Sequence, residues 1–147
     1  MRYLIMILLL TSTVQAQGLL VNDTDEFTGM QRVISEFVDV ESSEGLASVS
    51  VSYVDGNYFL ALTVVADSWL VLGSRTAYFV IDGRRSQSML FEIDSNVQGS
   101  KVVERYAIDV DDDTLLGAES IKFRINGVVY ECGEEVIESI NLVKRSI

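Results

Sequence analysis

The densest group of side chains that could do chemistry is an acidic cluster containing Asp109, Asp111 and Asp113. Oxygen ligands suit hard cations, and the spacing D-x-D-x-D opens an EF-hand calcium loop. Thr114 stands where that loop needs its turn glycine, and Ser120 stands where it needs the closing glutamate. We therefore interpret the cluster as the N-cap and acidic first turn of a helix. Weak calcium binding is the alternative.

Paired carboxylates can hydrolyse glycosides, and Glu92, Asp94 and Glu104 are the candidates for such a pair. They alternate with apolar neighbours, so we interpret them as the solvated face of strands. The sequence contains no histidine and one cysteine, Cys132. This excludes Ser-His-Asp and Cys-His catalysis and nearly all ordinary zinc sites. We predict no enzymatic activity and assign no catalytic, cofactor-binding or metal residues. Cys132 is either a buried, unpaired thiol or a partner in an intermolecular disulfide.

Aromatic residues are the remaining candidates for binding, as a platform for a carbohydrate or a peptide. Core packing is our preferred interpretation, because aromatics are enriched in strands. The set comprises Tyr53, Tyr58, Phe59, Trp69, Tyr78 and Phe79.

The elements that must position these residues follow an export signal. Met1-Arg2, an apolar run to Leu10 and the ending Val14-Gln15-Ala16 are typical of a secretory signal peptide, residues 1–16. Cleavage after Ala16 predicts a secreted or periplasmic protein without stable membrane insertion. Loss of Arg2 leaves 10 basic and 22 acidic residues. A chain so acidic is a poor partner for nucleic acid or anionic lipid.

Short strands with turns between them predict the architecture of the exported part. Residues 17–26 are expected to be a flexible lead-in, and 27–147 a single domain. Asp55-Gly56 and Asn126-Gly127 predict hairpins, and Gly83-Arg84-Arg85 predicts a third turn. The pattern favours a mainly β, antiparallel two-sheet sandwich of about seven or eight strands. The predicted strands are 32–40, 46–54, 58–66, 76–82, 88–94, 101–109, 121–125 and 128–131.

Two segments have helical features. Residues 111–118 begin with acids and contain Leu115-Leu116, which predicts a short connecting helix. Residues 134–145 place Val136, Ile140 and Val143 at helical spacing, with Lys144-Arg145 last, which predicts a C-terminal helix.

Several short motifs together carry a family resemblance. Asp25 to Gly29 reads D-E-F-T-G, residues 53–62 read YVDGNYFLAL, residues 78–83 read YFVIDG, and residues 121–125 read IKFRI. The chain in this respect resembles a family of small secreted bacterial β proteins of uncharacterised function with an N-terminal D-x-F-T-G motif. The segment 69–77 departs from that family's lysine-rich connection. The resemblance implies export and a β fold, and it brings no catalytic residues.

The sequence thus favours an exported, non-enzymatic binding or accessory domain with an unknown protein or glycan partner. A self-associating structural protein of the envelope and a carboxylate-based hydrolase are the alternatives.

Overall fold

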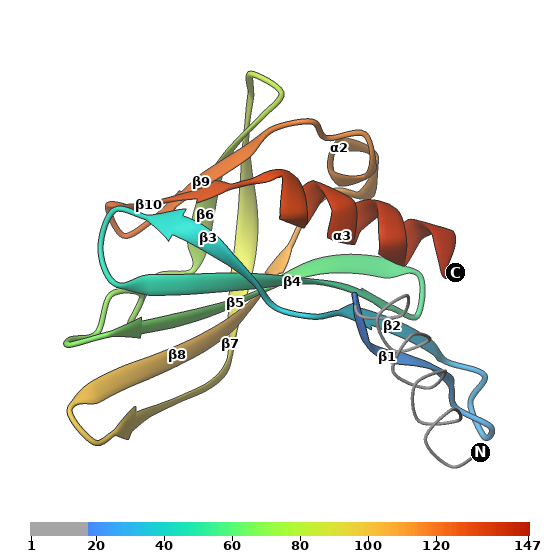
Figure 1. Ribbon diagram of the computed structural model, residues 1–147, viewed down its shortest axis with the longest axis horizontal. Coiled ribbons are helices and arrows are strands. Elements are labelled where there is room, and N and C mark those ends of the chain that lie inside the picture. The colour runs from blue at the N-terminus through green and yellow to red at the C-terminus, as the bar shows by residue number, and fades with distance from the viewer. Residues whose placement is uncertain (1–17) are drawn as a thin grey trace, which may run out of the picture.

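The computed structural model describes residues 18–147, so the predicted signal peptide and its cleavage site after Ala16 lie outside the described residues. This part of the chain is mainly β, with ten strands and two helices (Figure 1). The strands are β1 (Leu19–Thr24), β2 (Gln31–Ser35), β3 (Val38–Ser42), β4 (Leu46–Val54), β5 (Asn57–Ala66), β6 (Thr76–Ile81), β7 (Arg84–Gln98), β8 (Lys101–Asp109), β9 (Ile121–Ile125) and β10 (Val128–Cys132). The helices are α2 (Asp112–Leu116) and α3 (Glu134–Arg145). None of the helices among residues 18–147 is both long and apolar enough to cross a membrane.

The strands close into an eight-stranded antiparallel barrel, so the predicted two-sheet sandwich is wrong. The order around the barrel is β3-β4-β5-β8-β7-β6-β9-β10. Pairing of β10 with β3, at Tyr130↔Ser42 and Glu131↔Glu41, returns the sheet to its starting strand. Alternating patterns are the same in both architectures, because each strand has one inner and one outer face. What separates them is whether edge strands find a partner, and here they do.

A bulge divides the strand predicted at 32–40 into β2 and β3. Both strands pair with the same edge of β4, and the register shifts by one residue between Ile34↔Ser52 and Val38↔Val49. Ser35 supports this bulge, because its hydroxyl oxygen accepts a hydrogen bond from the Val51 N–H at 2.8 Å. Such a bulge bends its strand and increases the local twist.

Strand β1 occupies most of the predicted flexible lead-in, so that prediction is corrected. Its backbone pairs antiparallel with β2, from Leu19↔Ser35 to Thr24↔Gln31. The side chains of Asp23 and Arg32 add an ion pair across the two strands. Polar composition did not prevent a strand here, because backbone pairing with β2 satisfies the N–H and C=O groups on one edge of β1, and those on its other edge face away from the sheet. The β1–β2 hairpin projects away from the barrel (Figure 1).

Two-residue turns set the registers of three further hairpins. Asn126–Gly127 has φ angles of 49° and 79°, and Asp55–Gly56 has 48° and 89°, as type I′ turns require. The hairpin turns predicted at Asp55–Gly56 and Asn126–Gly127 are confirmed, as are the predicted short connecting helix and the C-terminal helix. The turn before β7 is tighter than predicted, because Asp82–Gly83 forms it and the strand already begins at Arg84.

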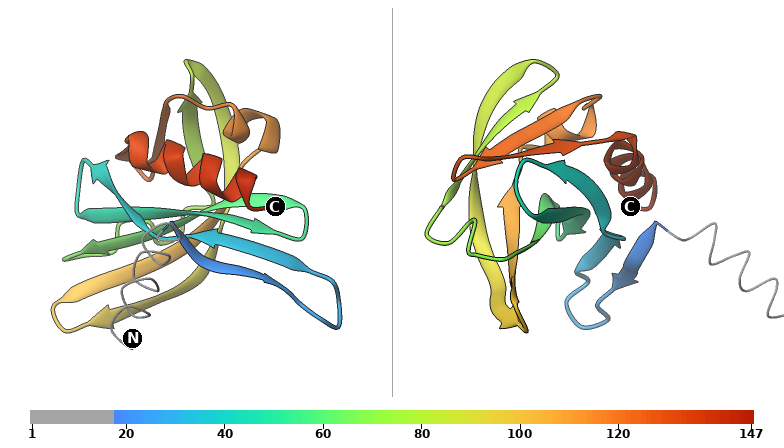
Figure 2. Two further views of the ribbon diagram at one scale, coloured as in Figure 1. Left: turned by 45° about the vertical axis from the view of Figure 1, so that its right-hand side comes forward. Right: turned by 60° about the vertical axis from the view of Figure 1, so that its left-hand side comes forward.

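Side chains fill the barrel. Phe79, Phe123 and Tyr130 stack in series from β6, β9 and β10, with ring centroids 5.0 Å apart. Helix α3 lies against β4 and beside α2, and it adds buried apolar residues such as Ile140 and Val143 to the same core (Figure 2). A small barrel with such residues inside has a packed core rather than a ligand cavity.

Candidate functional site

Glu104 on β8 is buried, which corrects its predicted place on a solvated strand face. Its side chain is 1 % exposed. One carboxylate oxygen accepts a hydrogen bond from the Leu70 N–H at 2.8 Å, and both oxygens lie 3.2 Å from the Val71 nitrogen. The Tyr106 hydroxyl donates to the same carboxylate at 3.3 Å. Glu104 therefore ties the segment between β5 and β6 to the inner wall of the barrel.

The surroundings of Glu104 are otherwise apolar and tyrosine-rich. Burial and the nearby Glu104 carboxylate raise the pKa of Tyr106 to about 12. Burial, with a smaller contribution from Glu104, also raises the pKa of Tyr130 far above its ordinary value. Within residues 18–147, the buried Tyr130 hydroxyl has no hydrogen-bond partner. These phenols stay protonated at neutral pH, so they are poor general bases.

Of the three candidate carboxylates, Asp94 and Glu104 lie on different faces of the sheet. Asp94 accepts a hydrogen bond from Arg105 at 2.9 Å on the outer face, whereas Glu104 points inward. The Glu92 side chain is exposed. Asp94 and Glu104 therefore do not face one bond together, which is the arrangement that glycoside hydrolysis needs.

The acidic cluster has the predicted capping role. Asp111 is the N-cap of α2, and its carboxylate accepts hydrogen bonds from the Thr114 N–H at 3.3 Å and the Thr114 hydroxyl at 2.9 Å. Asp109 and Asp113 are exposed. In the described part of the chain, no three acidic or cysteine side chains are grouped so as to hold a metal ion.

Cys132 ends β10 and is partly buried. Burial, followed by the charge of Glu131, raises the pKa of its thiol to about 12. The thiol therefore has little thiolate character at neutral pH.

The aromatic residues divide between core and surface. Tyr58 and Phe79 are buried, as core packing predicts, and Tyr53 and Phe59 are partly buried. Trp69 and Tyr78 remain exposed, by 40 % and 46 %. Tyr78 lies in the depression described next, so one member of the set fits a binding surface.

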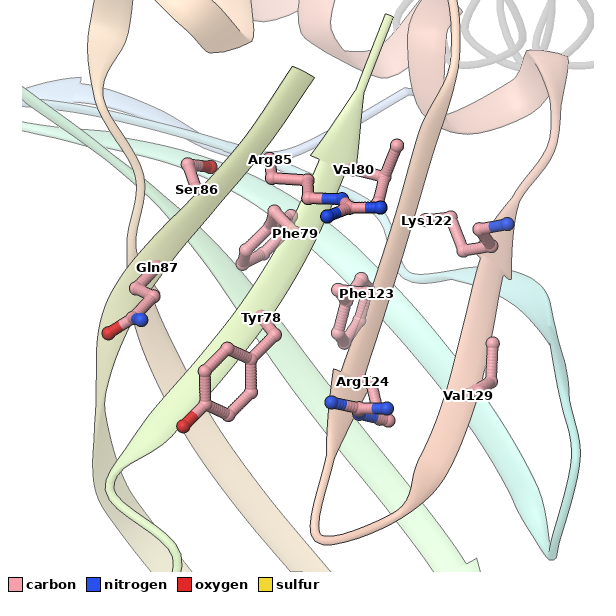
Figure 3. A pocket seen from close by; sticks show the side chains of 10 residues that line it. All are labelled: Tyr78, Phe79, Val80, Arg85, Ser86, Gln87, Lys122, Phe123, Arg124 and Val129. Atoms are coloured by element: carbon pink, nitrogen blue, oxygen red, sulfur yellow. The ribbon is translucent and has the colours of Figure 1, made fainter. Parts of the chain in front are cut away.

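A basic surface lies on the outer face of β6, β7, β9 and β10. The strand registers bring its side chains into two rows, since Tyr78 is opposite both Gln87 and Arg124, and Val80 is opposite both Arg85 and Lys122. The rows surround a depression of about 620 Å³ (Figure 3). We call this surface the basic face: Tyr78, Val80, Arg85, Gln87, Lys122, Arg124 and Val129.

The cations of the basic face have no carboxylate partner in the described residues. Ion pairs elsewhere in this part of the chain use the basic side chains of Arg32, Lys101 and Arg105. On the basic face, the Arg124 guanidinium instead lies 5.6 Å from the centre of the Tyr78 ring. Glu131 is opposite Lys122 in the β9–β10 register, at the rim of this surface. Three unpaired cations around apolar side chains suit an anionic ligand with an apolar part.

Sequence reasoning singled out Tyr78 and missed the cations. The alternation Ile-Lys-Phe-Arg-Ile does place Lys122 and Arg124 on one face of their strand. No local signal shows that Arg85, on another hairpin, joins them.

The D-x-F-T-G motif forms the turn at the tip of the β1–β2 hairpin. The Asp25 carboxylate accepts hydrogen bonds from the N–H groups of Phe27 and Thr28, both at 2.8 Å. These bonds lower the pKa of Asp25 below its ordinary value. The Phe27 side chain is 88 % exposed, so it does not pack at the start of a strand.

Comparison of the chain with protein-family models, with curated proteins and with solved structures gave no match.

Proposed function

We propose that this protein is an exported, non-enzymatic binding domain that takes an anionic partner on its basic face. The observation that carries the proposal is the gathering of three unpaired cations and an exposed tyrosine around one depression. The composition of the chain makes this arrangement unusual, because the net charge of the whole sequence is −11. A surface charged against the sign of the whole molecule favours a specific partner over general solvation.

The sequence supports the place of action. Residues 1–16 have the features of a secretory signal peptide, and the motif Asp25–Gly29 resembles that of small secreted bacterial β proteins. The domain therefore acts in the periplasm or outside the cell, where its partner is a protein or a glycan. The filled barrel core directs binding to the outer surface.

Self-association as a structural protein of the envelope is the second candidate. The exposed Phe27 at the tip of a projecting hairpin favours it, because solvent-facing aromatics of this kind are common contact points. A carboxylate-based hydrolase is disfavoured, since Glu104 is already engaged by two backbone N–H groups.

Co-purification from the native envelope tests the proposal. The exported protein is compared with the double variant Lys122→Glu/Arg124→Glu and with the control Lys144→Glu/Arg145→Glu. The control changes the net charge equally on exposed residues of α3, away from the basic face. We expect a stoichiometric partner to be retained by the wild type and the control and lost by the first variant. Equal retention by all three proteins contradicts the proposal, as does hydrolytic turnover abolished by changing one carboxylate.

A further inference from the structure

The hairpin tip Asp25–Gly29 is a preorganised and exposed element. Two hydrogen bonds to the Asp25 carboxylate fix the turn, and the Thr28 hydroxyl oxygen accepts a third from the Met30 N–H at 3.2 Å. Gly29 adopts a φ of 72°, which a residue with a side chain rarely adopts. A fixed backbone lowers the entropy lost when Phe27 binds a partner. The turn therefore exposes the Phe27 side chain to solvent, and this side chain is not part of the core.

The tip and the basic face have complementary chemistry. Beside Phe27 the tip carries Asp25 and the exposed Glu26, whereas the basic face carries three cations around an apolar floor. An aromatic ring suits the floor of Tyr78, Val80 and Val129, and flanking carboxylates suit the cations at its margin.

The hairpin tip and the strands that carry the basic face lie far apart in one molecule. The β1–β2 hairpin projects from the side of the molecule opposite β9 and β10 in Figure 1, and both views of Figure 2 separate them as well. A tip therefore reaches a basic face only on another molecule. Such a contact is heterologous, because it joins two different surfaces, and it repeats from copy to copy.

We propose that the hairpin tip Asp25–Gly29 of one copy docks into the basic face of a second copy, with Phe27 seated between Tyr78, Val80 and Val129. This contact is the self-association given above as the second candidate, and it rests on the basic face being the binding surface of the proposed function. Copies joined in this way form head-to-tail chains, and charge screening by salt weakens the contact.

Sedimentation velocity of the purified exported protein over a range of concentrations is the test. We expect the wild type to form dimers and larger species as its concentration rises. Phe27→Ser removes the ring, and we expect it to weaken association about tenfold or more. The matched control Phe91→Ser replaces an exposed phenylalanine of β7 outside both surfaces, and we expect it to associate like the wild type. Far-ultraviolet circular dichroism confirms that each variant is folded.

A mixing experiment distinguishes this contact from other modes of association. Phe27→Ser lacks the ring of the tip but retains the basic face, whereas Lys122→Glu/Arg124→Glu lacks the cations of the basic face but retains the tip. Each variant alone therefore lacks one half of the contact and is expected to be monomeric. Mixed in equal amounts, they are expected to form heterodimers and nothing larger, because only one productive contact is possible between them. A monomeric wild type, unchanged association of Phe27→Ser, or a mixture without heterodimers overturns the inference. If the wild type is monomeric while the basic-face variant still loses a co-purifying partner, this inference fails and the proposed function stands.

Discussion

Replacement of Glu104 by leucine tests whether the buried carboxylate stabilises or destabilises the folded barrel. Leucine is close in size, so the substitution leaves little empty space. It removes the acceptor for the N–H groups of Leu70 and Val71, which lie in a buried segment. Glu104→Gln is the companion variant, because it retains one carbonyl oxygen but has no charge.

The magnitude follows from two opposing effects. Each buried N–H left without an acceptor costs about 1–3 kcal/mol, which gives about 2–6 kcal/mol for Leu70 and Val71. Relief from burying an ionised carboxylate offsets part of this loss, since such burial costs several kcal/mol before hydrogen bonds compensate it. We expect a net loss of about 3 kcal/mol for Glu104→Leu and about 1–2 kcal/mol for Glu104→Gln.

Urea denaturation followed by tryptophan fluorescence and circular dichroism measures these changes. Trp69 precedes Leu70 directly, so its emission reports on the anchored segment. Amide hydrogen exchange is expected to accelerate at Leu70 and Val71 more than at the central residues of β4 and β5. A leucine variant as stable as the wild type would refute the reasoning, because desolvation of the carboxylate would then outweigh its hydrogen bonds.

Four further predictions concern Cys132, refolding and solubility. Because the pKa of Cys132 is raised to about 12, its thiolate fraction at pH 8 is about 1,000-fold below that of an ordinary thiol. Its reaction with a thiol reagent should therefore be slow in the folded protein and should accelerate when urea unfolds the chain. The same shift makes stability fall as pH rises beyond about 9, which urea denaturation at pH 8 and pH 10 would detect as a larger loss in the wild type than in Cys132→Ala, whose remaining loss comes from the raised pKa values of Tyr106 and Tyr130. The chain has no proline, so refolding from urea under reducing conditions at low concentration should lack a minute-scale phase, and a slow phase independent of concentration would contradict this. Light scattering should increase as pH falls from 7 towards the sequence pI of about 4.3, where net charge vanishes, and unchanged scattering would contradict this.

Local features of the fold were predictable where a residue type meets a specific backbone requirement. Asn126–Gly127 supplies the two positive φ angles of a type I′ turn, and the sequence places it between two alternating runs. Helix α3 begins with Glu134 and Glu135 and ends with Lys144 and Arg145, which match the helix dipole, and its predicted bounds are confirmed. Such signals act over a few residues, so they can be recognised in one sequence.

Closure of the barrel was not predictable in the same way. It depends on pairing between β3 and β10, which lie far apart in the sequence, at Glu41↔Glu131 for example. The pair places two acidic side chains opposite each other, which is unfavourable on its own. Closure is thus favoured by backbone pairing of both edge strands and by the hydrogen bond from the Val129 N–H to the Ser43 hydroxyl, which no short sequence pattern indicates.

Glu104 shows how a period-2 pattern can be misinterpreted. Its neighbours on the same face of β8 are Tyr106 and Ile108, both buried, so alternation alone indicates an inward position. The charged side-chain type of Glu104 indicated the solvent-facing side of the strand instead, because a charged side chain is seldom buried without partners. The partners that resolve the conflict are backbone N–H groups more than thirty residues earlier, and backbone groups leave no trace in a sequence.

The basic face depends on register, and its parts differ in how far the sequence specifies them. The Asn126–Gly127 turn fixes the pairing of β9 with β10, so Lys122 and Arg124 share one face with Val129. A slip of one residue between β6 and β9 would break the inner stack of Phe79 with Phe123, because their rings would then lie on opposite faces. The same register places Tyr78 beside Arg124 on the outside. Packing of the core therefore positions the residues of the basic face, which explains why the cations could be assigned to a strand face from sequence but not to a common site.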